Sequence, residues 1–157
     1  MLRPHKAFYV IAHNIRSLYN VGSIFRTADA FNVTKIFLTG FTGTPDNPSH
    51  AKKIGKVALG AEKFVAWEYI KSPGALINKL KKEKVRIIGL ENNVKAKNVT
   101  KFRPKFPLAL VLGEETTGIN KKLLKLCDEV IEIPMFGKKE SLNVAVAFGI
   151  AAFVIKS

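Results

Sequence analysis

The segment LALVL at residues 108–112 constrains the fold more than any other feature of this sequence. Every residue in it is apolar, whereas a strand with one solvated face alternates apolar and polar side chains. A strand of this kind is buried on both faces, which is typical of a parallel sheet covered by helices on each side. Shorter apolar runs recur along the chain, with helical patterns between them. The sequence therefore predicts an α/β fold with a mostly parallel sheet and helices on both faces.

The chain of 157 residues is long enough for one hydrophobic core, and we expect a single domain over residues 1–157. The patterns predict strands at residues 7–12, 35–39, 63–66, 85–90, 108–112 and 130–133, and helices at 20–31, 51–59, 73–83, 120–127 and 141–155. Asn20 is well placed as the N-cap of the first helix. Ligands of parallel sheets bind beyond the carboxyl ends of the strands, so the loops after residues 90, 112 and 133 are the expected site.

Charge is the first indication of function. The chain has 26 Lys and Arg residues against 12 Asp and Glu, a formal net charge of +14. A field of this size favours a polyanion such as RNA or DNA, although a general preference for lysine would give the same composition. No apolar run approaches the roughly 18 residues of a membrane span. The single Cys127 excludes an internal disulfide, and we expect a cytoplasmic protein in which this cysteine is structural.

The segment GEETTG at residues 113–118 has the glycine spacing of a phosphate-binding loop but lacks its chemistry. Ile119 and Asn120 stand where such a loop needs Lys and Ser or Thr, and two glutamates would repel the phosphates. A nucleotide triphosphatase is therefore excluded. Glu115 either hydrogen-bonds a neutral or cationic ligand, or favours the macrodipole of the helix that follows Asn120.

The first helix and the segment before it contain further candidates. Arg26 lies one turn after Gly22, opposite the apolar stripe of the helix, and is either functional or a solvated, ion-paired arginine. Arg16 and Lys35 would suit contacts with phosphate groups. His13 follows the first strand and is a possible base, although a lone histidine is more often incidental. No set of residues has metal-ligand spacing, so we expect no metal.

The last helix is nearly all apolar, yet it begins with Ser141 and Asn143. A helix that is apolar around its circumference must be buried. Polar side chains in its first turn therefore sit at the edge of the core and face either backbone or a ligand.

Three segments taken together resemble the three motifs of the SpoU (TrmH-like) RNA 2′-O-methyltransferases of the SPOUT superfamily. They are Asn20-Val21-Gly22 with Arg26-Thr27-Ala28; Val111-Leu112-Gly113-Glu114-Glu115 with Gly118; and Ile133-Pro134-Met135 with Gly137 and Ser141-Leu142-Asn143-Val144. The resemblance covers nearly the whole chain. It implies a C-terminal deep trefoil knot, a homodimer, and transfer of a methyl group from S-adenosylmethionine (AdoMet) to a ribose 2′-hydroxyl of structured RNA. By analogy tRNA is favoured over ribosomal RNA.

The resemblance also implies roles for individual residues. The catalytic positions would be Asn20, Arg26, Glu115, Ser141 and Asn143. The AdoMet-binding positions would be Leu90, Glu91, Leu112, Gly113, Ile133, Pro134, Met135 and Leu142. The RNA-binding positions would be Arg16, Arg26, Lys52 and Lys53. Because a guanidinium is not deprotonated in proteins, we expect Arg26 to grip the phosphate beside the target ribose, with that phosphate or a water taking the proton.

Two positions depart from the family pattern. Glu114 stands where Ser or Asn is more usual, and Ala145 stands where Ser is common, which puts AdoMet affinity in question. No separate RNA-recognition domain is expected, so the basic surface would select the substrate. The alternatives are a non-catalytic RNA-binding or assembly protein that retains the fold, and a DNA-binding protein.

Overall fold

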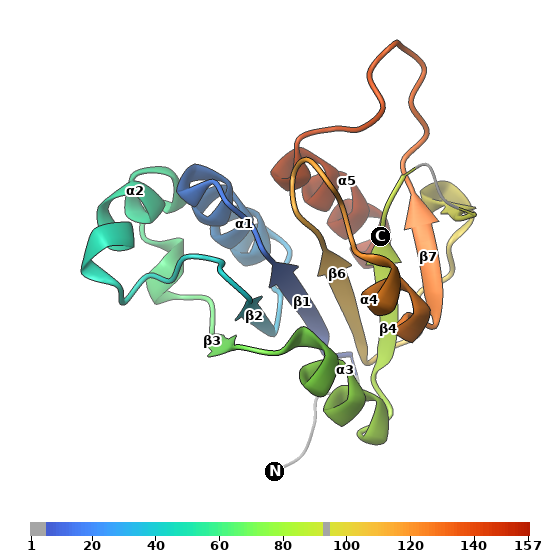
Figure 1. The fold of residues 1–157 in the computed structure, drawn as a ribbon, viewed down its shortest axis with the longest axis horizontal. Helices are drawn as coiled ribbons and strands as arrows, with labels where there is room; N and C mark the ends of the chain where they lie inside the picture. The colour runs from blue at the N-terminus through green and yellow to red at the C-terminus, as the bar shows by residue number, and fades with distance from the viewer. Residues whose placement is uncertain (1–5, 93–94) are drawn as a thin grey trace.

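The computed structural model describes residues 6–92 and 95–157. Within these ranges seven strands form one sheet in the order β3-β2-β1-β6-β4-β7-β5, and every neighbouring pair is parallel (Figure 1). The strands are β1 (Phe8–His13), β2 (Lys35–Thr39), β3 (Trp67–Ile70), β4 (Arg86–Leu90), β5 (Lys97–Asn98), β6 (Leu108–Leu112) and β7 (Glu129–Glu132). The helices are α1 (Leu18–Ala30), α2 (Pro48–Ala58), α3 (Pro73–Lys82), α4 (Lys121–Leu126) and α5 (Val144–Lys156), with 3₁₀ turns η1 (Ala61–Lys63) and η2 (Val99–Lys101).

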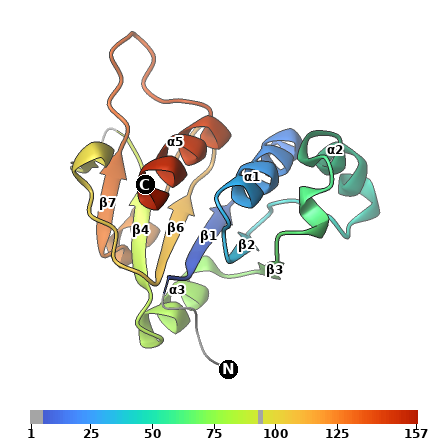
Figure 2. The ribbon, with the colours of Figure 1, turned by 180° about the vertical axis from the view of Figure 1, so that it is seen from behind.

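The sheet is covered on both faces, as the sequence predicts. Strand β6 is buried at all five positions and its side chains alternate between two cores. Leu108, Leu110 and Leu112 pack in the larger core with residues of α1, α2 and α5. Ala109 and Val111 pack in the smaller core with residues of α3 and α4. Figure 2 shows α1 and α5 side by side over the larger core, where the two helices contact each other. The predicted α/β layer arrangement is confirmed.

One predicted strand is wrong. Residues 63–66 start at the last residue of the 3₁₀ turn η1 and continue into the loop after it, where the buried Val65 donates its backbone N–H to the carbonyl of Ala61. The strand begins instead at Trp67 and forms the edge of the sheet, with Glu68 and Tyr69 exposed. Only Val65 of this apolar run is buried, so the run resembles a strand in sequence without forming one. The exposed edge strand that follows carries little apolar signal.

Helix starts differ from the prediction at two functional positions. Ser17, not Asn20, caps α1, because the Ser17 side chain accepts from the backbone N–H of Asn20 at 3.1 Å. Asn143 caps α5 through the N–H groups of Ala145 and Val146, so Ser141 lies in the preceding loop. The Asn20 side chain is thereby free to make contacts outside its own helix.

A long connection over residues 133–143 links β7 to α5 and projects beyond the ends of the strands in both views (Figures 1 and 2). It carries Phe136, which is 96% exposed. Helix α5 is the most apolar helix, but neither it nor any other helix in the described ranges is long and apolar enough to cross a membrane.

Candidate active site

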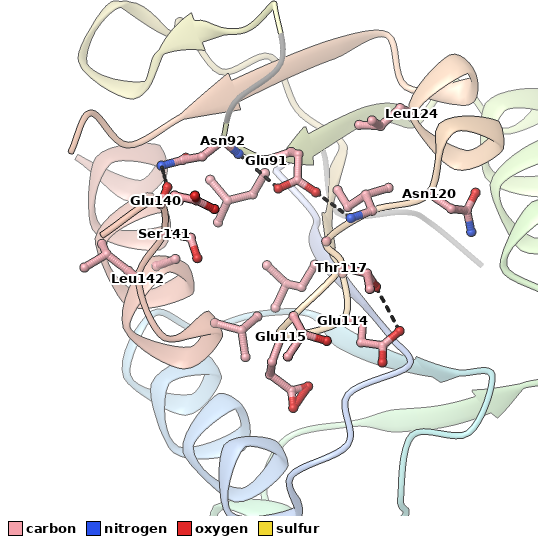
Figure 3. Close-up of a pocket in the computed structure, with 18 of the residues that line it drawn as sticks. Glu91, Asn92, Glu114, Glu115, Thr117, Asn120, Leu124, Glu140, Ser141 and Leu142 are labelled. Atoms are coloured by element: carbon pink, nitrogen blue, oxygen red, sulfur yellow. Dashed lines mark hydrogen bonds between the residues drawn. The ribbon is translucent and has the colours of Figure 1, made fainter. Parts of the chain in front are cut away.

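A pocket of about 430 Å³ lies at the carboxyl ends of β4, β6 and β7, where the loops after these strands meet the segment before α5. Figure 3 shows Glu140, Ser141 and Leu142 on one side of it and Asn120 on the opposite side. Of the predicted site residues, those that line the pocket are Leu90, Glu91, Leu112, Gly113, Glu115, Ile133, Ser141 and Leu142. Pro134 and Met135 follow directly in the chain but do not belong to its lining, and neither do Asn20, Arg26 and Asn143.

Glu91 ties two of these loops together. Its carboxylate accepts hydrogen bonds from the backbone N–H of Ile119, at 2.5 Å, and of Asn92, at 3.1 Å. Gly118 lies directly against this carboxylate with φ +72°, and a Cβ there would overlap the Glu91 oxygens. The carboxylate is therefore engaged with backbone donors and shapes the wall of the pocket.

Asn92 connects the loop after β4 to the loop after β7. Its amide donates to the carbonyl of Ile133 at 2.9 Å, and its oxygen accepts from the Ile133 N–H at 3.3 Å. A further contact at 3.5 Å joins the amide to the carbonyl of Glu140. Asn92 is not among the residues predicted from the sequence. Its only signal is a polar side chain next to the predicted site residues Leu90 and Glu91, and asparagine is common in any turn.

The loop at 113–118 is tightly folded. The Gly118 N–H donates to the Glu114 carbonyl at 2.8 Å, and the backbone of Gly113 lies so close to Gly118 and Ile119 that a Cβ would overlap them. This compact turn presents the side chains of Glu114 and Glu115 toward the start of α1.

The Glu115 side chain forms hydrogen bonds at the N-terminus of α1. Its carboxylate accepts from the backbone N–H groups of Arg16, at 2.9 Å, and of Ser17, at 3.2 Å. A negative charge at this end of a helix is favourable. Glu115 therefore favours the macrodipole of α1. The predicted interaction with the helix after Asn120 is wrong, because that helix is capped by Asn120 itself, which accepts from the Leu123 N–H.

Glu114 holds the Arg16 side chain, with 2.6 Å between its Oε1 and the arginine Nε. The hydrogen bond from Arg16 lowers the pKa of the Glu114 carboxyl, and a second one from Thr117 acts in the same direction. Glu114 therefore stays ionised and paired with Arg16.

Asn20 and Asn143 meet, although they are 123 positions apart in the chain. The Asn143 amide donates to the Asn20 oxygen at 3.1 Å, while the Asn143 oxygen caps α5. The two predicted catalytic asparagines thus join α1 to the start of α5.

Arg26 lies apart from this cluster. It is exposed, and it follows Asn20 by six residues, which places it about 240° further around the helix. Among the described residues Arg26 has no hydrogen-bond or ion-pair partner. The predicted RNA-binding lysines, Lys52 and Lys53, are exposed on α2.

His13 and Cys127 do not line the pocket. Burial lowers the pKa of His13, a shift that the nearby Glu114 charge opposes, and its Nδ1 lies 2.9 Å from the Thr39 hydroxyl. Burial also raises the pKa of Cys127 to about 11, so its thiol is protonated and unreactive at neutral pH. In the described part of the chain no three His, Cys, Asp or Glu side chains are grouped as a metal ion would require.

The pocket is acidic, although the protein is basic. Four glutamates line it, at positions 91, 114, 115 and 140, against one lysine, Lys121. Apolar side chains from all three strand ends and from the start of α5 complete its walls. Such a lining opposes a polyphosphate and suits a ligand with an apolar or neutral body and positive charge.

Comparison with known proteins places these features in a family context. The model of the SpoU rRNA Methylase family matches residues 7–153. A tRNA (guanosine(18)-2′-O)-methyltransferase of Aquifex aeolicus is 28% identical over 151 residues, which is 96% of this chain and 69% of that protein. A 23S rRNA (guanosine-2′-O-)-methyltransferase of Escherichia coli is 32% identical over 148 residues, 93% of this chain and 58% of that protein.

The fold is shared with solved structures. An AdoMet-bound rRNA methyltransferase from Sinorhizobium meliloti superposes with a TM-score of 0.89 at 23% identity, over 99% of this chain and 58% of that one. The chain thus spans less than two thirds of the length of the Escherichia coli and Sinorhizobium proteins.

Proposed function

Since this chain belongs to the SpoU methylase family, we propose that it is an AdoMet-dependent methyltransferase acting on a ribose 2′-hydroxyl of RNA. The observation that carries the proposal is the acidic, partly apolar pocket at the carboxyl ends of β4, β6 and β7. Relatives named as tRNA and 23S rRNA 2′-O-methyltransferases support the reaction. The high positive charge outside the pocket supports an RNA substrate.

The residues of the pocket fit AdoMet. Its adenine and ribose would contact backbone groups of Leu90–Glu91, Leu112–Gly113 and Ile133, with Leu142 closing the pocket. Its sulfonium and ammonium charges agree with the glutamate-rich lining, whereas the phosphates of a nucleotide do not. When bound, AdoMet supplies a methyl group activated by positively charged sulfur.

The protein must align the 2′-hydroxyl with this methyl group and stabilise the negative charge that develops on the oxygen. We assign phosphate binding beside the target ribose to Arg26, whose guanidinium is exposed and has no partner in the described residues. Asn20, Ser141 and Asn143 are the candidates for hydrogen bonds to the ribose. Glu115 is a positioning residue, because it accepts from the N–H groups of Arg16 and Ser17.

A homodimer would complete the site, since Arg26 is not part of the pocket lining in its own chain. Helix α5 exposes Val146, Ile150 and Phe153 beside α1, which carries Arg26. An apolar surface of this kind suits a second copy of the chain, which would bring α1 of one copy to the pocket of the other. The family's trefoil knot is likewise proposed. The proposal is supported by contacts of the connection over residues 133–143 with the loop after β4: the Asn92 amide contacts the carbonyls of Ile133 and Glu140.

The first experiment measures methyl transfer from labelled AdoMet to unmodified bulk tRNA and, in parallel, to ribosomal RNA. We expect incorporation into ribose, preferentially in tRNA, and its loss in Arg26→Ala. Arg26→Lys should lose most of the rate, because the ammonium lacks the planar fork that grips phosphate. AdoMet-induced thermal stabilisation without methylation of either pool would point to another RNA. Absence of both would favour the non-catalytic RNA-binding protein.

Subunit mixing tests the shared site. Arg26→Ala has an intact pocket, and Leu142→Trp fills the pocket but keeps Arg26. If Arg26 serves the partner's pocket, mixed dimers of the two inactive variants should recover up to about a quarter of the wild-type rate, since half of the dimers are mixed and each has one complete site. No recovery, with mixed dimers detected by co-purification of differently tagged subunits, would place Arg26 at the pocket of its own chain.

A further inference from the structure

A second hollow, of about 360 Å³, lies beyond the carboxyl end of β2 and outside the pocket described above. It is bordered by the segment from Gly40 to His50 and by Tyr69 of β3. Two aromatic rings line it and stay exposed to solvent: Phe41 is 50% exposed and Tyr69 is 44% exposed. Both lie outside the two hydrophobic cores.

The Phe41 ring is presented by a firmly held backbone. The Phe41 N–H donates to the side-chain oxygen of Asn14 at 3.0 Å, and the Tyr69 hydroxyl donates to the Gly40 carbonyl at 2.7 Å. The next residue, Thr42, is buried, and its hydroxyl donates to the Ala12 carbonyl at 3.0 Å. Little conformational freedom remains to be lost when a flat ligand binds here.

Arg16 connects the hollow to the active-site loop. Its guanidinium carbon lies 4.8 Å from the centre of the Phe41 ring, and its Nε contacts Glu114, which lines the first pocket. The Arg16 side chain is 67% exposed. Its two terminal nitrogens donate to no group in residues 6–92 and 95–157, so they are available to an RNA phosphate at the rim.

The lining favours a nucleobase over a phosphate. Asp46 borders the hollow, and its charge would repel a phosphate group inside it. His50 accepts the Thr44 N–H at Nδ1, so its neutral form carries the ring proton on Nε2 and can donate to a ligand. The hollow thus offers aromatic rings for stacking, His50 as a hydrogen-bond donor and Asp46 as an acceptor. Proteins recognise single-stranded RNA by stacking and hydrogen-bonding unpaired bases in this way.

We propose that this hollow binds one unstacked nucleobase of the RNA substrate, stacked on Phe41, close to the nucleotide whose ribose is methylated. The inference rests on the proposed function, because it takes the neighbouring pocket as the methylation site. It identifies the substrate as an RNA with unpaired bases at the target, such as a loop, and not a continuous duplex.

The test compares Phe41→Ala with Phe64→Ala, a matched control at an exposed phenylalanine after η1 that is not part of either pocket. The affinity for bulk unmodified tRNA is measured for each variant, beside that for a fully paired RNA duplex. Because Phe41→Ala loses one stacked base, its affinity for tRNA should be about 5- to 100-fold lower than that of wild type, and its affinity for the duplex should be unchanged. Phe64→Ala should bind as wild type, and AdoMet stabilisation should be the same in all three proteins.

Phe41→Trp and Phe41→Leu separate stacking from simple apolar contact. The tryptophan variant should retain tRNA affinity and have its added fluorescence quenched by tRNA, measured against wild type, which contains Trp67 alone. The leucine variant should bind as weakly as Phe41→Ala. Full affinity of Phe41→Leu, or of Phe41→Ala, would overturn the proposal. Wild-type protein that binds no RNA would refute the proposed function instead.

Discussion

At the scale of single residues, the shape of the candidate pocket depends on the Glu91 side chain and on the absence of a side chain at Gly118. Glu91 holds the Ile119 and Asn92 N–H groups, and Gly118 leaves room for its carboxylate. Hydrogen bonds from backbone N–H groups to a charged carboxylate are among the stronger hydrogen bonds in proteins. Glu91 can form them here because Gly118 has no Cβ to occupy the space of its carboxylate. The position of the Glu91 carboxylate in the pocket wall is therefore fixed by its hydrogen bonds to backbone N–H groups.

Gly118→Ala should damage this wall. The added Cβ meets the Glu91 carboxylate, and φ +72° is strained for alanine, so we expect the free energy of unfolding to fall by about 1–3 kcal/mol. AdoMet-induced stabilisation should fall with it. Urea denaturation with and without AdoMet measures both effects. Gly137→Ala is the matched control, because no atom lies within 4 Å of a Cβ at that position, and its unfolding should be unchanged. Equal stability of the two variants would contradict this account.

At the scale of elements, helix ends bring the motifs together. Asn143 caps α5 and donates to Asn20 in the first turn of α1, while Glu115 accepts the N–H groups that precede and cap α1. The predicted catalytic residues of three distant segments thus share the ends of two helices. Their side chains were expected at an active site, and they also have structural roles that stabilise the junction.

Substitution of Asn143 can separate the two roles. Asn143→Ala loses the cap and should cost about 1 kcal/mol of unfolding free energy. Asn143→Asp keeps the acceptor that caps α5 but lacks the donor to Asn20, so its stability should stay close to wild type while methylation falls. Chemical unfolding and methyl transfer are measured for both. Ser72→Ala, which removes the cap of α3, is the control: it should lose similar stability and keep its activity. Wild-type activity of Asn143→Asp would rule out a role for the Asn143 amide donor in methylation.

At the scale of the whole molecule, charge is unevenly distributed. The chain carries a net charge of +14, yet the pocket has four glutamates and one lysine. Helices α2 and α3 both carry exposed lysines, and they lie apart in both views (Figures 1 and 2). If RNA approaches the carboxyl ends of the strands, basic residues on α2 should contribute more to binding than those on α3.

The salt dependence of RNA binding tests this asymmetry. Replacing Lys52 and Lys53 with alanine should lower the slope of log affinity against log salt by up to about 2 units, because phosphate contacts release counterions. The pair Lys79→Ala, Lys82→Ala on α3 removes the same charge and should change the slope little. Fluorescence anisotropy over a range of salt concentrations measures both. Identical slopes would show that net charge alone attracts the RNA.

The sequence by itself determined the covered parallel sheet, because burial on both faces leaves a local trace in runs such as Leu108–Leu112. It also located the strand ends that form the pocket, since the carboxyl edge of a parallel sheet is common to all its strands. Its failures were also local: residues 63–66 are not a strand, and the caps of α1 and α5 lie at Ser17 and Asn143.

Only the tertiary structure decided which polar groups meet. Asn92 with Ile133, Asn20 with Asn143, and Arg16 with both Glu114 and Phe41 are contacts between segments far apart in the chain. Local propensity carries no information on such pairs, because their geometry follows from the order of the strands in the sheet and from the direction in which each loop leaves it. The hollow beside β2 has no motif in the sequence for the same reason: its aromatic, basic and acidic side chains are gathered by the fold.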